Sequence, residues 1–203
     1  MPALPTADQI TTLQIDRVDR WHRDEIDCES TSDDLLRLIC QQHASNFRLW
    51  HQEDLARAPA ATDTEIAKVK RTIDRLNQQR NDQIELVDDA IAVVLRDAGV
   101  TLRSDAKLNT ETAGSAIDRL SIMALRLFHY REQIDRDAGT SHTQTVQQRL
   151  AMCNQQHADL SDALQELLDD LVAGRKQHRT YRQMKMYNDP SLNPAIYIAS
   201  KET

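Results

Sequence analysis

Three segments of the chain place a histidine three residues before an acid, a spacing that puts both side chains on one helix face, one turn apart. The pairs are His22 with Glu25, His51 with Asp54, and His129 with Glu132. Such pairs can chelate a metal ion, and helical bundles hold dimetal sites built from carboxylates and histidines. The established di-iron motif has the reverse order, Glu-x-x-His, so a dimetal bundle stays an alternative. His51 and His129 are also candidates for acid–base catalysis.

A second set of residues suits a hard cation. It consists of four acids on two expected helices, the second over about 33–57 and the third over about 63–98: Glu53, Asp54, Glu85 and Asp88. Because Mg²⁺ prefers carboxylate oxygens, the sequence predicts a magnesium site between these helices. The same acids are the candidates for a general base.

The middle of the third expected helix carries polar residues where its apolar seam should continue. Arg80 and Gln83 occupy seam positions, and a polar stripe flanks the apolar face, with Asp74, Asn77, Asn81, Glu85 and Asp88. A buried charge without a partner is strongly destabilising, so Arg80 must be paired, and the carboxylates of this stripe are the nearest candidates. The alternative is a structural polar network or a solvated flank.

The fourth expected helix has apolar residues on two sides, which predicts that it is buried all round. Its ionisable side chains should then face other helices: Asp118, Arg119, Arg126, His129 and Glu132. Interhelical pairing is the structural alternative to a functional role for them. On the fifth helix, His157 occupies a seam position, where a lone histidine is usually a satisfied core residue.

The segment 175–185 holds five cations and no acid, although the formal net charge of the chain is −7. Arginine binds oxyanions through two parallel hydrogen bonds, so this segment, with Tyr181 and Tyr187, could clamp a phosphate or a sugar nucleotide. The alternative is a solvated face that balances acids elsewhere. The candidates for holding an anionic ligand are Arg57, Asn77, Arg80, Asn81, Asp118, Arg119, Arg126, Arg179, Arg182 and Lys185.

Long helices are needed to position these residues, and the composition favours them. The 203 residues include four Gly, five Pro and 4% aromatic residues, so the core must be aliphatic and the turns few. Apolar residues recur at helical spacing over about 6–28, 33–57, 63–98, from 110 onward, and 143–173. The sequence predicts an all-α antiparallel bundle of four to five long helices with an irregular C-terminal tail. We expect one domain over 1–203, with a flexible start at 1–5 and a basic segment and tail at 175–203.

Composition also excludes some classes of protein. No apolar stretch approaches the ~20 residues that cross a bilayer, and the first residues lack the pattern of a signal peptide. A cytoplasmic protein without a membrane span is therefore expected. Cys28, Cys40 and Cys153 form no CxxC pattern, which predicts reduced core thiols. The acidic balance argues against general nucleic-acid binding.

Four blocks of the sequence resemble a known family. They read NFRLWHQEDLAR at 46–57, KRTIDRLNQQRNDQIELVD at 70–88, LNTETAGSAIDRLSIMALRLFHY at 108–130 and GRKQHRTYRQMKMYNDPSLNP at 174–194. Through them the chain is similar, over about residues 35–195, to the bacterial family called domain of unknown function 4254. The resemblance implies no established activity; it implies genes encoded near glycosyltransferases of cell-envelope sugar assembly. Since the blocks contain the polar residues above, it favours a shared polar site.

Two functions follow from the sequence. The first is an enzyme or binding protein for a phosphate-bearing small molecule, a nucleotide or sugar nucleotide, with acids holding Mg²⁺ and arginines holding phosphate, linked to cell-envelope glycan metabolism. Helical nucleotide pyrophosphohydrolases work in a similar way, but their acidic motif is only half present, as Glu85-x-x-Asp88. The second is a non-catalytic scaffold or homodimeric interaction protein, in which polar seams set helix register and the tail at 187–197 docks on a partner. Polar residues that converge on one pocket favour the first function, and separate pairs favour the second.

Overall fold

The computed structural model describes residues 4–136, 139–186 and 191–194. Five helices account for most of this part: α1 (Ala7–Trp21), α2 (Asp34–Leu55), α3 (Asp63–Asp97), α4 (Ala113–Asp135) and α5 (Thr140–Val172). Two short strands, β1 (Lys107–Leu108) and β2 (Lys176–Gln177), pair in parallel. The predicted all-α bundle is confirmed. The strand pair was not predicted, because a strand of two residues is too short to show an alternating sequence pattern.

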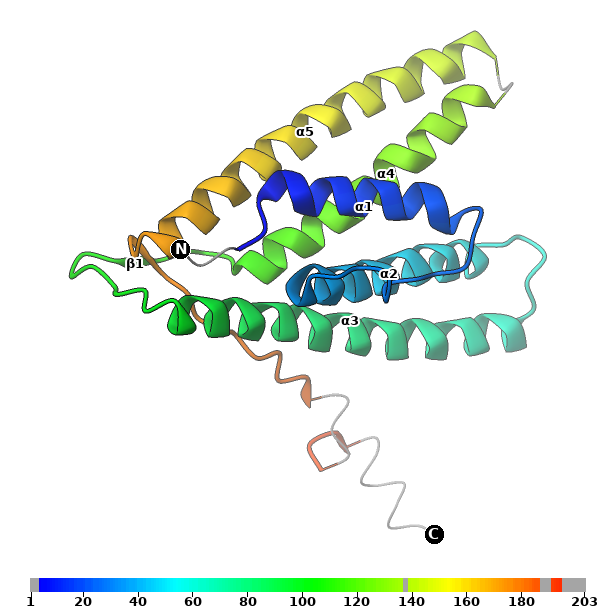
Figure 1. Cartoon of the computed structure of the whole chain (residues 1–203). Helices are drawn as coiled ribbons and strands as arrows, with labels where there is room; N and C mark the ends of the chain where they lie inside the picture. The colour runs from blue at the N-terminus through cyan, green and yellow to red at the C-terminus, as the bar shows by residue number, and fades with distance from the viewer. Residues whose placement is uncertain (1–3, 137–138, 187–190, 195–203) are drawn as a thin grey trace.

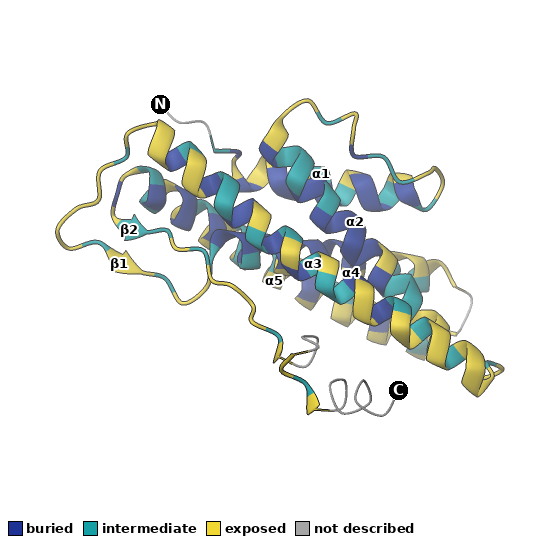
Figure 2. Cartoon of the chain, turned by 90° about the horizontal axis from the view of Figure 1, so that it is seen from below, coloured by how far each residue is buried: buried dark blue, intermediate teal, exposed yellow. Residues whose placement is uncertain are grey.

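The helices pack around α4, which contacts all four of the others. Helices α2 and α3 form one antiparallel pair, and α4 and α5 form a second whose closed end extends beyond the other helices (Figure 1). Helix α1 lies against α4, α2 and α5. Buried residues lie on the faces that the helices turn toward one another, while much of α3 is exposed on its outer side (Figure 2).

Local signals fix most helix ends. Thr6 is the N-cap of α1 and Thr62 is the N-cap of α3. Each forms a capping box with the residue three positions later, Gln9 and Glu65, a spacing that predicts such a helix start. The predicted end of the first helix near residue 28 is wrong, because α1 ends at Trp21. Beyond it the Asp27 carboxylate accepts the backbone N–H of Glu29 at 2.9 Å, a turn that leads the chain back toward α2.

One aliphatic core joins all five helices. Each helix contributes a fully buried side chain, namely Ile10, Ile39, Ile91, Leu120 and Leu164. Burying a side chain of this size stabilises the fold by about 1.5–3 kcal/mol. A second cluster, which contains Trp21 and Phe47, lies between α1, α2 and α4. The three cysteines are buried free thiols, as expected.

After α5 the chain pairs with β1 and then crosses α3 near Glu85 and Asp88 without forming a helix over 178–185 (Figure 1). The tail at 187–197 lies largely outside the described residues, as do residues 1–3 of the predicted flexible start. Leu4 packs against the main core and Pro5 is buried, so the described part of that start is packed. Within the described ranges, no helix is both long and apolar enough to cross a membrane.

Candidate functional site

Three histidines from different helices meet between α1, α2 and α4. His22 caps the C-terminal end of α1, His51 lies near the end of α2, and His129 lies in the C-terminal half of α4. One ligand nitrogen of each ring lies within 4.8 Å of those of the other two. The ring centroids are 5.2 to 5.8 Å apart. We call these three residues the histidine cluster; all three are half-buried.

Hydrogen bonds fix the tautomers of two of these rings. His22 Nδ1 lies 2.7 Å from the Val18 carbonyl oxygen, and His129 Nδ1 lies 2.6 Å from a Glu132 carboxylate oxygen. Both oxygens only accept, so Nδ1 carries the proton in each ring. The Nε2 atoms of both rings are buried and have no hydrogen-bond partner. Metal-binding histidines have this arrangement, in which an acceptor holds one nitrogen and the other keeps its lone pair.

Aromatic rings surround the cluster and orient it. Phe128 stacks on His22 at 3.8 Å and 17°, and Trp50 stacks on His129 at 4.8 Å and 8°. Phe47 meets His51 edge to face at 4.5 Å. Burial, together with the neighbouring His22 and His129 rings, lowers the pKa of His51, so its imidazole is neutral at pH 7. A neutral imidazole is the form that binds a metal ion.

The donor atoms of the cluster select a class of ion. Imidazole nitrogens suit zinc, copper, iron and nickel, whereas Mg²⁺ takes oxygen ligands. Three protein ligands also leave a position open for water or substrate, as in catalytic zinc sites. The cluster can therefore hold a divalent transition-metal ion and offer it to a ligand.

The four acids predicted to bind magnesium lie apart. Glu53 pairs with Arg57, in the turn that follows its own helix, at 2.6 Å, and Asp54 is exposed. Asp88 is buried and accepts the Gly114 N–H at 2.8 Å, and burial raises its pKa. Glu85 binds residues of the C-terminal segment. Among the described residues, these acids form no group of three or more metal-ligating side chains.

Helix register explains this separation. Ser45 on α2 donates a hydrogen bond to Gln83 on α3 at 2.6 Å, which fixes how the antiparallel helices align. Glu53 lies eight residues beyond Ser45, which is about 12 Å along the axis of α2. Because the two helices are antiparallel, Glu85 lies on the other side of the Ser45–Gln83 contact. The two acid pairs thus lie at different heights of the bundle.

The cation in the seam of α3 finds its partner on another helix. Arg80 Nε donates to Asp118 of α4 at 2.7 Å, and the guanidinium forms a second bond to the same carboxylate. The prediction that carboxylates of its own helix pair with Arg80 is therefore wrong. Gln42 and Asn46 of α2 also donate to Asp118, and we call these four residues the Asp118 network. It ties α2, α3 and α4 together.

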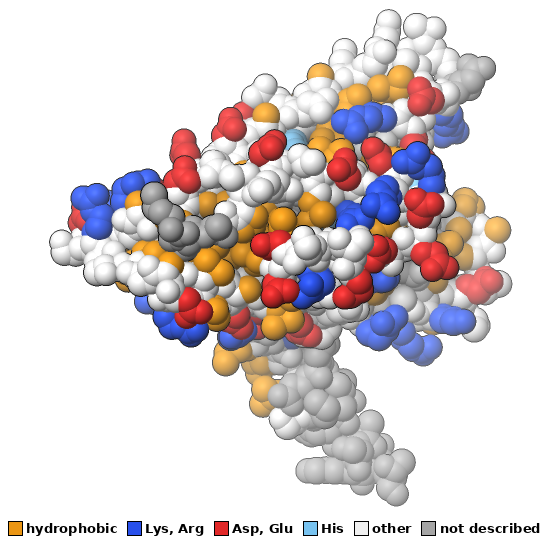
Figure 3. All heavy atoms as spheres, viewed as in Figure 1, with side chains coloured by type: hydrophobic (Ala, Val, Ile, Leu, Met, Phe, Trp, Pro, Cys, Tyr) orange, Lys and Arg blue, Asp and Glu red, His pale blue; other side chains and the backbone are white. Residues whose placement is uncertain are grey.

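The other predicted residues of α3 and α4 occupy separate positions. Helix α4 is not buried all round, because Arg119 and Arg126 are exposed and Arg119 pairs with Glu111 at 2.7 Å. Asn81 is buried and Asn77 half-buried. On the face of Figure 3, acidic and basic side chains are interspersed. These residues therefore do not converge on the histidine cluster, and Arg119 belongs to a separate local pair.

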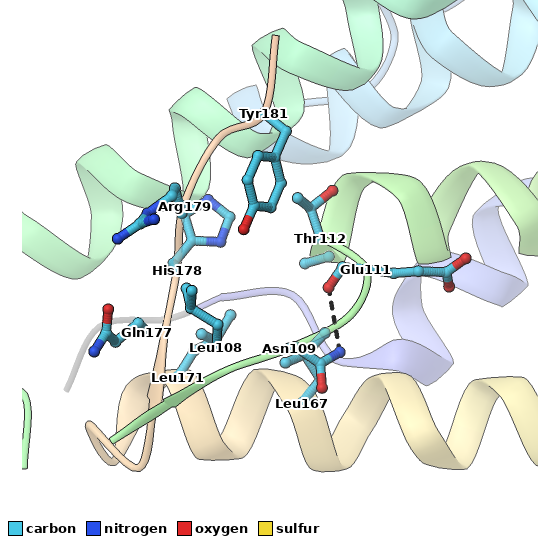
Figure 4. A pocket seen from close by; sticks show the side chains of 11 residues that line it. Leu108, Asn109, Glu111, Thr112, Leu167, Leu171, Gln177, His178, Arg179 and Tyr181 are labelled. Atoms are coloured by element: carbon cyan, nitrogen blue, oxygen red, sulfur yellow. Dashed lines mark hydrogen bonds between the residues drawn. The ribbon is translucent and has the colours of Figure 1, made fainter. Parts of the chain in front are cut away.

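Acids of the bundle pair with three of the five cations of the segment 175–185, namely Asp170 with Arg175 and Lys176, and Glu85 and Asp89 with Arg182. Arg182 binds Glu85 at 3.1 Å and Asp89 at 2.9 Å, and these carboxylates raise its pKa. Arg179 lines a hollow of about 10 Å³ beside Tyr181 (Figure 4). That volume holds about one water molecule. Lys185 is half-buried. The segment leaves no cavity for a nucleotide at this position.

Of the predicted candidates, the structure brings His51 and His129 together, and His22 completes the cluster. The sequence signal for all three was the histidine–acid spacing, although only Glu132 of the three acids bonds to its histidine. The rings that enclose the cluster, Trp50 and Phe128, gave no separate signal in the sequence.

Comparison with known proteins bears on the family alone. No match to the chain was found among the curated proteins or among the solved structures. The family model described as "Protein of unknown function (DUF4254)" matches residues 36–180. That range includes α2 from its third residue onward, all of α3, α4 and α5, two residues of the histidine cluster and the whole Asp118 network. The chain belongs to the DUF4254 family.

Proposed function

We propose that this chain binds a divalent transition-metal ion through His22, His51 and His129 and presents it to a phosphate-bearing small molecule, a nucleotide or a sugar nucleotide. One observation carries the proposal. The Nε2 atoms of His22 and His129 are buried without partners, on rings whose ligand nitrogens lie within 4.8 Å of each other and of His51. Buried polar atoms normally have a partner, so two unpaired atoms at one place indicate a missing ligand.

The expected chemistry follows from the donor set. Three nitrogen ligands would leave the ion an open position, where it would polarise a phosphoryl oxygen or lower the pKa of a bound water to about 7. Glu132 holds His129 in the tautomer that offers Nε2. The stacked rings of Trp50 and Phe128 shield the histidines from water and limit their rotation.

Metal titration tests the proposal. The full chain, stripped with a chelator, is titrated with Zn²⁺ against a chromophoric competitor, and we expect one high-affinity ion per chain. Removing an outer partner of a metal ligand weakens affinity about 10- to 100-fold, so Glu132→Gln should fall in that range and His51→Ala should lose more.

His157 provides the matched control. It is another half-buried histidine with an unpartnered Nε2, but it lies on α5 and belongs to no described group of three metal-ligating side chains. His157→Ala should bind Zn²⁺ like the wild type. Equal losses in His51→Ala and His157→Ala, or no binding by the folded wild type, would reject the proposal.

The second candidate function is a non-catalytic scaffold or homodimer. It is supported by the separate ion pairs, above all the bonds of Arg80 to Asp118 and of Arg182 to Glu85. Such pairs set helix register without forming a pocket. This function predicts self-association in sedimentation experiments and no specific Zn²⁺ binding, whereas the first predicts binding whatever the oligomeric state.

A further inference from the structure

A surface groove begins beside the histidine cluster. It runs between α2 and α3, has a volume of about 540 Å³, and includes His51 in its lining. Small-molecule sites range from about 300 to 1,000 Å³, so the groove has room for a sugar phosphate or a nucleotide. Because His51 belongs to both the groove and the cluster, a ligand in the groove lies next to the proposed metal site.

The charge of this groove is unusual for an acidic protein. Arg48 contributes a guanidinium from α2 and Arg75 contributes another from α3, and no carboxylate lines the groove. Neither arginine forms an ion pair with the described residues. By contrast, Arg80 on α3 pairs with Asp118, and Arg182 in the C-terminal segment pairs with Glu85. Three other surface hollows of similar size each include an acid, namely Glu65, Asp159 and Asp169.

Neutral donors and an apolar floor complete the lining. Gln52 and Gln79 offer amide groups from the two walls, while the Thr72 hydroxyl between them donates to the Lys68 carbonyl at 3.2 Å. Phe47 and Leu76, both buried, contribute the apolar part. Polar donors that converge over an apolar base are typical of sites for small polar ligands.

We infer that Arg48 and Arg75 bind the phosphate group of a phosphate ester, which lies in the α2–α3 groove with its reactive end toward His51 and the metal. The inference rests on the proposed function for its metal, but the anion site has contacts of its own. Arginine binds phosphate through two parallel charge-assisted hydrogen bonds, and two guanidinium groups from facing helices match a tetrahedral dianion. Neither arginine interrupts an apolar seam, so the sequence pattern alone does not single it out.

Uridine monophosphate is the probe, and uridine is its neutral counterpart. Binding of each to the Zn²⁺-loaded full chain is measured by calorimetry. We expect the monophosphate to bind and uridine to bind at least about tenfold more weakly, since a hydrogen bond to a charged group contributes about that factor or more. Arg48→Gln with Arg75→Gln should abolish the difference between the two ligands while Zn²⁺ affinity stays unchanged.

The control replaces two exposed arginines elsewhere, Arg20→Gln on α1 with Arg149→Gln on α5, which lowers the net charge by the same amount. This variant should bind like the wild type. All four positions are exposed, so the fold should survive both double substitutions, as circular dichroism would verify.

Each outcome is decisive. Loss of monophosphate binding in the groove variant alone supports the inference. Equal losses in both variants indicate a general charge effect and overturn it, as does a wild type that binds Zn²⁺ but not the monophosphate. A wild type that binds no Zn²⁺, yet binds the monophosphate through Arg48 and Arg75, rejects the metal function and leaves the anion site standing.

Discussion

Replacing Arg80 by methionine should destabilise the fold by about 2–3 kcal/mol. Asp118 is only 4% exposed, so the substitution leaves its carboxylate buried without a cation. Breaking a buried pair from one side costs about 3–5 kcal/mol. We expect a loss at or below the bottom of that range because the Arg80 side chain is 24% exposed and two donors of α2 stay bonded to Asp118. This loss is a large share of the ~5–15 kcal/mol that stabilises a typical domain.

A second substitution isolates the buried charge as the cause. Asp118→Asn keeps the shape and one acceptor oxygen for Gln42 and Asn46 but removes the charge. In the Arg80→Met background it should recover about 1–2 kcal/mol, since a neutral amide no longer needs the cation. Urea unfolding followed by circular dichroism measures all four members of this cycle. A loss below about 0.5 kcal/mol in Arg80→Met, typical of a surface site, would refute the reasoning, as would a double variant less stable than the single one.

Three further predictions concern other parts of the fold. Gly114→Ala should cost about 1–3 kcal/mol in thermal unfolding, because its Cβ would meet the Ile84 carbonyl at 2.8 Å. Burial lowers the pKa of His43 to about 3, so the folded state holds this imidazole neutral. Its contribution to the free energy of unfolding is therefore complete above about pH 6.5 and falls by up to about 1.4 kcal/mol per pH unit below that. His43→Gln should make the free energy of unfolding depend less on pH in this acid range. Arg182→Gln should speed hydrogen exchange at 176–186 and leave global stability nearly unchanged, since the ion pairs of Arg182 with Glu85 and Asp89 are exposed to solvent on the arginine side.

Much of the fold is predictable because its determinants are local. Caps at Thr6 and Thr62 and a regular aliphatic period define helices without reference to the rest of the chain. The end of α1 was not predictable from periodicity, because apolar residues continue at helical spacing while the backbone N–H groups of Arg23 and Asp24 turn back to the Arg20 carbonyl. Nor was the partner of Arg80, since Asp118 lies 38 residues away and is brought near only by packing of α3 against α4.

The candidate site was predictable only as separate parts. The histidine–acid spacing identified three segments, of which the one with His22 and Glu25 lies at and beyond the end of α1, and their meeting depends on how α1, α2 and α4 cross. The magnesium prediction placed acids of α2 and α3 opposite each other, and the register set by Ser45 and Gln83 keeps them apart. Arg48 looks like any exposed arginine until the groove beside His51 is seen.

X-ray absorption at the zinc edge, on the Zn²⁺-loaded full chain, tests the central claim most directly, because it reports the atoms bound to the ion. The account predicts a first shell with three imidazole nitrogens at about 2.0–2.1 Å, and one fewer in His51→Ala. A shell of oxygens alone, or sulfur at about 2.3 Å from a cysteine, would contradict it.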